Sequence, residues 1–264
     1  MNMAESRSPL KDKPLRNPGQ SVREQRLNFA YDKVLAPALL AFVMLYVAGT
    51  DWFRYFYPLK SMPWVTTLMA LGVIGYAVWQ FFKQWPKVRA MKLAEDGEKA
   101  VGQHLEALRT AGYSVFHDVL GDGFNVDHVV VGPAGVFTIE TKAWSKPAKG
   151  AAEITFDGES LLAAGREPER NPVVQAKAQA NWLRQILAES TGKPYSVWPV
   201  VLFPGWFVKN SRESFTNLWV LEPKAFNKFL ANEKIELAPE DISLAAFHLS
   251  QFIRGQERAL AARR

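Results

Sequence analysis

Two long uncharged segments near the N-terminus limit what this chain can fold into. Residues 34–50 and 63–82 contain no Asp, Glu, Lys or Arg and are mostly apolar. As helices rising about 1.5 Å per residue, they would be about 25 and 30 Å long, which matches the hydrocarbon core of a bilayer. The sequence therefore predicts a transmembrane helical hairpin over residues 34–82, with spans at about 34–53 and 63–82.

Two other interpretations fit apolar segments of this length. The segments could form a helical hairpin buried in a globular core, or the first segment could belong to a cleaved signal peptide. A signal peptide is disfavoured because the largely polar residues 1–33 precede the first segment and no small-residue cleavage pattern accompanies it.

Aromatic and basic residues at the ends of the two segments predict their orientation. Tyr and Trp, which favour the membrane–water interface, gather around the connector and at the far end of the second segment. Basic residues lie mainly on the outer flanks, namely Arg16, Arg23, Arg26, Lys33, Lys83, Lys87, Arg89 and Lys92. The positive-inside rule then predicts an integral membrane protein with both termini in the cytoplasm, as in a bacterial inner membrane. We expect residues 1–33 to form a disordered basic tail and residues 83–93 a basic juxtamembrane linker.

The distribution of charge weakens one argument that the composition invites. The formal net charge is +6 and the pI is near 9.4, values that suggest a nucleic-acid partner. The basic surplus lies before residue 93, however, and acidic residues slightly outnumber basic ones after it. Overall basicity is therefore no evidence for nucleic-acid binding. The chain has no cysteine, which excludes disulfides, a thiolate nucleophile and a cysteine zinc site.

Residues 94–264 have the pattern of a globular domain. Helices are expected at residues 95–111, 172–189, 223–231 and 239–254, and strands at 113–119, 126–131, 136–142, 195–203 and 217–222. A further hairpin is expected within residues 152–165, turning at Asp157 and Gly158. Asn171 followed by Pro172 is a typical helix start. These elements predict a small α/β or α+β domain preceded by the transmembrane hairpin, and we adopt the α/β class.

The hairpin over residues 126–142 carries three charged residues among its apolar ones. If Gly132 to Gly135 form a four-residue loop, Val131 faces Val136, and Asp127 falls opposite Glu140. Side chains alternate between the faces of a strand, so Asp127, Glu140 and Lys142 share one face. A register shifted by two residues would instead set Asp127 against Lys142, on the same shared face.

Two opposed carboxylates need a compensating positive charge. Like charges at directly opposed positions of a sheet are destabilising. A divalent cation between Asp127 and Glu140 would remove this repulsion, and hard carboxylate oxygens suit Mg²⁺ or Mn²⁺. Lys142 adds a point charge beside the same place. The alternative is an ordinary ion pair at the rim of the sheet.

Three further polar residues accompany the hairpin. Glu98 shares a helix face with Val101, Leu105 and Leu108, and thus lies on an apolar stripe. A Glu in a first helical turn is also favoured by the helix dipole alone. Gln175 lies in the first turn after Asn171 and could be a polar contact or a surface residue. His128 points away from the acids in a regular strand, so we interpret it as a core histidine or one that supports Asp127 from behind.

Three stretches taken together resemble the nuclease-related domain (NERD) family. They are DGEKAVGQHLEAL, NVDHVVVGPAGVFTIETK and NPVVQAKAQANWL, within residues 94–190. The family is similar to the PD-(D/E)XK nuclease superfamily, which implies a restriction-endonuclease-like mixed sheet flanked by helices. The resemblance implies that Asp127 and Glu140 are the metal-binding acids and that Lys142 is the lysine of the E-x-K element. Glu98 and Gln175 match the helix glutamate and the later glutamine of the family.

The resemblance implies a Mg²⁺- or Mn²⁺-dependent nuclease, a phosphodiester hydrolase that acts at the cytoplasmic face of the membrane. Its partners would be nucleic acid, DNA rather than RNA, and the lipid bilayer, while protein partners stay unknown. Three alternatives remain: a non-catalytic nucleic-acid-binding module, a membrane scaffold that keeps the nuclease fold, and a hydrolase of smaller phosphate esters.

Overall fold

The computed structural model describes residues 15–57, 62–121, 123–210 and 217–262. The chain divides into two compact units. One unit is the helical segment 21–93. The other combines residues 94–264 with the N-terminal residues up to 20, so the chain enters this unit, leaves it for the helical unit and returns.

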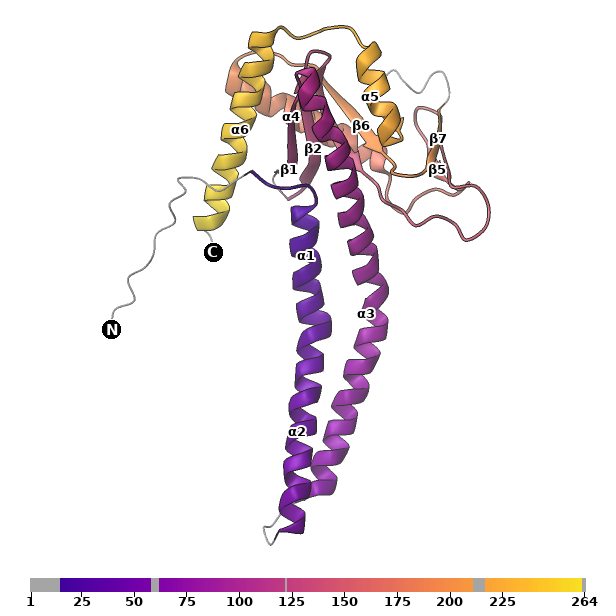
Figure 1. Ribbon diagram of the computed structural model, residues 1–264, viewed down its shortest axis with the longest axis vertical. Coiled ribbons are helices and arrows are strands. Elements are labelled where there is room, and N and C mark those ends of the chain that lie inside the picture. Colours follow the sequence, from indigo (N-terminus) through magenta and orange to yellow (C-terminus); the bar gives the residue numbers. More distant parts are fainter. Residues whose placement is uncertain (1–14, 58–61, 122, 211–216, 263–264) are drawn as a thin grey trace, which may run out of the picture. The chain divides into compact units, whose positions relative to one another are not determined.

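The helical unit is a hairpin of two long helices (Figure 1). One helix consists of α1 (Gln20–Ala30), a π-helical turn (Tyr31–Leu35) and α2 (Ala36–Phe56). The other is the first part of α3 (Pro63–Glu106), up to residue 93. Near the connector, the Trp52 indole N–H donates to the Thr67 hydroxyl over 2.7 Å. At the other end, the Lys87 ammonium lies 4.5 Å from the centre of the Phe29 ring. These contacts hold the two helices side by side.

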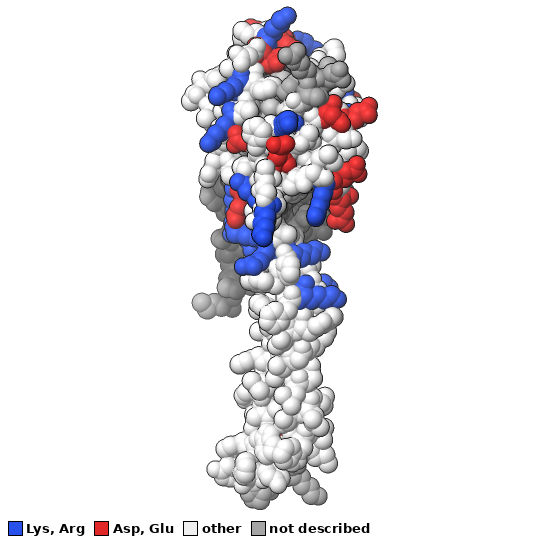
Figure 2. Space-filling model, turned by 90° about the vertical axis from the view of Figure 1, so that its right-hand side faces the viewer, with Lys and Arg blue, Asp and Glu red and all other residues white. Residues whose placement is uncertain are grey.

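Both helices are long and apolar enough to cross a membrane. Only 6% of the residues in the most apolar stretch of each helix are buried, so these stretches are not packed inside a protein core. Figure 2 shows one face of the hairpin free of charged side chains over most of its length, with basic side chains gathered at one end. This pattern argues against the buried-hairpin interpretation among the described residues.

The flanks of the hairpin differ from our expectation. Residues 20–33, predicted as part of a disordered tail, are helical, and residues 83–93, predicted as a linker, lie within α3 together with Pro86. Extending an existing helix costs little compared with nucleating one, so the apolar helices continue into the polar flanks. Of the rest of the predicted tail, residues 15–19 are described and residues 1–14 lie outside the described residues.

A five-stranded mixed sheet forms the core of the second unit. Its strands are β1 (Ser114–Leu120), β2 (Asn125–Gly132), β3 (Gly135–Thr141), β6 (Val197–Leu202) and β8 (Trp219–Leu221), in the order β1-β2-β3-β6-β8. The pairs β1–β2 and β2–β3 are antiparallel, whereas β3–β6 and β6–β8 are parallel. Pro199 is accommodated within β6, so the predicted central strand is confirmed despite its proline.

A smaller sheet lies beside the main one. It has the order β5-β4-β7, from β4 (Glu153–Phe156), β5 (Leu161–Ala163) and β7 (Phe207–Asn210). The first two strands form the hairpin predicted within residues 152–165. The sequence did not predict β7, a short strand without a buried residue.

Helices cover both faces of the main sheet. α4 (Pro172–Thr191) and α6 (Pro239–Ala262) pack on one face, where Leu183, Leu249 and Val136 belong to one apolar cluster. The C-terminal part of α3 and α5 (Pro223–Asn232) pack on the other, where Leu105 and Phe226 belong to one apolar cluster. A short 3₁₀ helix (Ala107–Ala111) follows α3. The predicted α/β class, a mixed sheet flanked by helices, is confirmed.

Candidate metal and phosphodiester site

The register of the β2–β3 hairpin agrees with the sequence analysis. Val131 pairs with Val136, and the ladder runs on to His128 opposite Ile139. One step further, the same register sets Asp127 across from Glu140 and excludes the register shifted by two residues. The turn is tighter than we expected, because Gly132 and Gly135 also pair.

The carboxylates at this end of the hairpin have defined partners. Asp127 Oδ2 accepts a hydrogen bond from the Thr141 backbone N–H at 2.7 Å. Glu140 is only 3% exposed, and its Oε1 accepts from the Lys142 ammonium at 2.5 Å. The other carboxylate oxygen of Glu140 accepts from Gln179 Nε2 at 2.6 Å.

α4 presents two glutamines to the hairpin. Asn171 caps the helix by accepting from the Val173 backbone N–H, as predicted, and this fixes where the helix begins. Gln175 Oε1 then accepts from the Lys142 ammonium at 3.2 Å. Gln179, one turn further along the same helix face, is buried and reaches Glu140. Sequence analysis missed Gln179, although its spacing of four from Gln175 was a usable signal.

Glu98 joins the other acids electrostatically. It is 6% exposed on α3, and its pKa is raised to about 8, mainly by burial and then by the negative charges of Asp118 and Glu140. The positive charge of Lys142 acts in the opposite direction. The pKa of Asp127 is also raised well above its usual value by burial and by the charges of Glu140 and Glu98. The fold therefore gathers like charges that repel one another.

His128 belongs to a different arrangement. It is fully buried, and its Nδ1 lies 2.9 Å from Nδ1 of His117, whose Nε2 in turn lies 2.7 Å from Glu106 Oε1. Burial lowers the pKa of both histidines. The structure thus pairs His128 with His117, which in turn contacts Glu106.

Asp118 is a further buried acid that the sequence analysis missed. Its backbone φ is +51°, a left-handed conformation that Asp tolerates better than most residues. Its carboxylate accepts from Arg16 Nε at 2.6 Å and from Asn125 Nδ2 at 3.3 Å. An Asp in an otherwise apolar strand was a visible signal, whereas nothing in the sequence linked it to Arg16.

The donor set can be tested against a metal ion. No group of three or more His, Cys, Asp or Glu side chains within the described ranges is spaced to hold a metal. Mg²⁺ is commonly held by only one or two carboxylates together with water and substrate phosphate. Asp127 and Glu140 supply that number. In addition, the buried Gln179 Oε1 has no hydrogen-bond partner among the described residues, while its amide nitrogen is committed to Asn125 and Glu140. Hard oxygen donors of this kind fit Mg²⁺ or Mn²⁺.

Comparison with known proteins gives a family match over this part of the chain. Residues 93–204 match the model of the nuclease-related domain (NERD) family. The matched segment runs from the C-terminal part of α3 through β6, and it contains Glu98, Asp127, Glu140, Lys142 and both glutamines of α4. No curated protein and no solved structure matches the chain.

Proposed function

Because residues 93–204 form a nuclease-related domain, we propose that this protein is a membrane-anchored, metal-dependent nuclease that hydrolyses phosphodiester bonds. Its substrate is DNA rather than RNA, and it acts at the cytoplasmic face. The observation that carries the proposal is the grouping of Asp127 and Glu140 at one end of a buried hairpin, with Lys142 bound to the second acid. The two carboxylates repel each other, and a cation bound between them would relieve this repulsion.

The residues of the chain divide the work as follows. Asp127 and Glu140 hold the cation, with the Thr141 N–H orienting the first carboxylate and Gln179 orienting the second. When bound, Mg²⁺ or Mn²⁺ supplies Lewis acidity and lowers the pKa of its water. Glu98, on the neighbouring helix, adds a carboxyl group whose raised pKa keeps it mostly protonated near neutral pH, and a bound cation would favour its charged form.

Lys142 is the residue placed to act on the phosphate. An ammonium group has three N–H donors, and Glu140 and Gln175 accept two of them. The third donor is available for the attacking water or for a phosphoryl oxygen, whose negative charge grows in the transition state. A donor held in advance at such a position contributes to the rate because it needs no reorganisation during the reaction.

The two apolar helices provide the membrane anchor in this proposal. Their length, apolar composition and exposure support spanning. The basic residues on the outer flanks of the hairpin favour cytoplasmic termini by the positive-inside rule. Protease protection of right-side-out membrane vesicles tests this topology: the domain should be digested only after the vesicles are opened.

A cleavage assay tests the activity with the full chain in detergent micelles. Plasmid DNA, linear DNA and RNA are incubated with Mg²⁺, Mn²⁺ or EDTA. Lys142→Ala and Asp127→Asn should abolish cleavage, whereas Lys228→Ala, which changes an exposed lysine of α5, should not. A membrane scaffold would instead show no metal-dependent cleavage and no effect of Lys142→Ala. Phosphatase activity on small esters without cleavage of polymers would favour the smaller-substrate alternative.

A further inference from the structure

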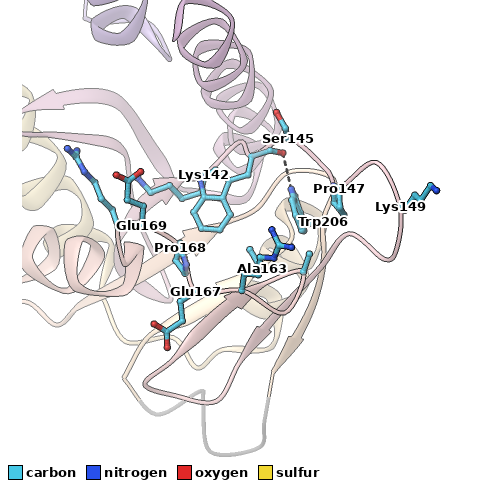
Figure 3. A pocket seen from close by; sticks show the side chains of 13 residues that line it. Lys142, Ser145, Pro147, Lys149, Ala163, Glu167, Pro168, Glu169 and Trp206 are labelled. Atoms are coloured by element: carbon cyan, nitrogen blue, oxygen red, sulfur yellow. Dashed lines mark hydrogen bonds between the residues drawn. The ribbon is translucent and has the colours of Figure 1, made fainter. Parts of the chain in front are cut away.

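A cavity of about 670 Å³ lies directly beside Lys142. Its walls come from the segment after β3, from the turn and loop between β5 and α4, and from the residue preceding β7. Figure 3 shows Lys142, Pro168 and Trp206 lining it from these three segments. The volume is in the range of sites for small ligands.

The cavity combines positive charge with an aromatic wall. The basic residues that line it are Lys142, Lys149, Arg166 and Arg170, and they outnumber the acidic ones, Glu167 and Glu169. The ammonium of Lys146 lies 3.6 Å from where a side chain on Gly205 would begin, and Gly205 precedes the lining residue Trp206. Such a surplus suits a phosphate-bearing ligand.

Trp144 is the aromatic residue placed for stacking. It is partly exposed in the cavity wall, and its ring packs edge-on against buried Phe203 at 5.0 Å between ring centres. The indole N–H of buried Trp206 donates to the Trp144 backbone carbonyl at 3.1 Å (Figure 3). The first contact restrains the ring and the second restrains the backbone that carries it before any ligand arrives, which lowers the entropy cost of binding.

From these features we infer that the cavity is a subsite for one or two unpaired nucleotides next to the cleaved phosphate. A base stacks on Trp144, and the surrounding Lys and Arg side chains contact the flanking phosphates. Bases within a duplex are already stacked on their neighbours, so only a single strand or a frayed end presents a free base to this ring. The inference rests on the proposed nuclease function and narrows its substrate to single-stranded or open-ended nucleic acid.

Equilibrium binding without divalent metal tests the subsite separately from cleavage. The full chain in detergent is titrated into a fluorescent single-stranded oligonucleotide, a blunt duplex of the same sequence and an abasic single strand. Trp144→Ala should weaken binding of the normal single strand about tenfold. Trp144→Phe, which keeps a ring, should bind within about threefold of wild type, and the abasic strand should be insensitive to both changes. Thermal unfolding of each variant confirms that it is folded.

The outcomes separate the subsite from the nuclease proposal. Unchanged single-strand binding by Trp144→Ala, or equal binding of duplex and single strand by wild type, overturns the subsite even if the enzyme cuts DNA. Trp144-dependent single-strand binding establishes the subsite. If such binding occurs but wild type cuts no nucleic acid with Mg²⁺ or Mn²⁺, the subsite stands and the nuclease proposal fails.

Discussion

Arg16 should be essential to the stability of the unit formed with residues 94–264, although it precedes the first apolar helix. Its Nε donates to Asp118 Oδ2 at 2.6 Å, and the two side chains are only 8% and 3% exposed. A second guanidinium nitrogen lies 3.7 Å from Glu257 on α6. Pro18, two residues later, packs against Gly102 of α3. The segment at residues 15–18 is thus part of the domain.

Arg16→Met should lower the free energy of unfolding by about 3 kcal/mol. Removing one partner of a buried ion pair costs about 3–5 kcal/mol, because the other charge is left buried. The lower end applies here because Asn125 still donates to Asp118. For a domain of this size, 3 kcal/mol corresponds to a fall in Tm of about 6–12 °C. The measurement is thermal unfolding of the full chain in detergent, followed by circular dichroism.

A double-mutant cycle identifies the cause. Arg16→Met combined with Asp118→Asn removes both charges of the buried pair, so the double variant should be more stable than the sum of the two single losses predicts. Arg23→Met, which changes an exposed arginine of α1, is the control and should leave Tm unchanged. A Tm for Arg16→Met within about one degree of wild type would refute the reasoning.

Two further predictions concern buried polar groups around the site. Gln179→Ala removes the donor to Glu140 Oε2 and should lower the free energy of unfolding by about 1–3 kcal/mol. It should also weaken Mn²⁺ binding measured by calorimetry, and an unchanged Mn²⁺ affinity would show that Gln179 does not orient Glu140. The pKa of His117 is lowered in the folded state, chiefly by burial, so the free energy of unfolding should fall as pH drops below about 6.5, where the unfolded chain takes up the proton first. His117→Gln should flatten the dependence of Tm on pH between 6.5 and 5, and an equally steep curve would contradict this assignment.

The sequence was informative where structure follows a local pattern. The turn residues Gly132 to Gly135 suggested the hairpin register, and the alternation of side chains between the two faces of a strand then placed Asp127 and Glu140 on one face. The cap at Asn171 predicted where α4 begins. The sequence alone therefore identified Asp127, Glu140 and Lys142 as candidate site residues.

The sequence was uninformative where contacts join distant segments. Arg16 and Asp118 are separated by 102 positions, and Arg16 lies in a polar stretch whose composition resembles a disordered tail. No local periodicity encodes such a pairing. The cavity beside Lys142 depends on the same kind of information, since its walls come from three segments that only the fold brings together. The β7 strand was missed because it buries none of its residues.

The measurement that tests the central claim most directly is the single-turnover cleavage rate of labelled single-stranded DNA by the full chain, at saturating Mn²⁺. The account predicts cleavage by wild type that EDTA abolishes, and a rate at least about 100-fold lower for Lys142→Ala. It also predicts no cleavage by Asp127→Asn at the same Mn²⁺ concentration. Cleavage that persists in EDTA, or equal rates for wild type and both variants, would contradict the assignment of Asp127, Glu140 and Lys142 as the reacting site.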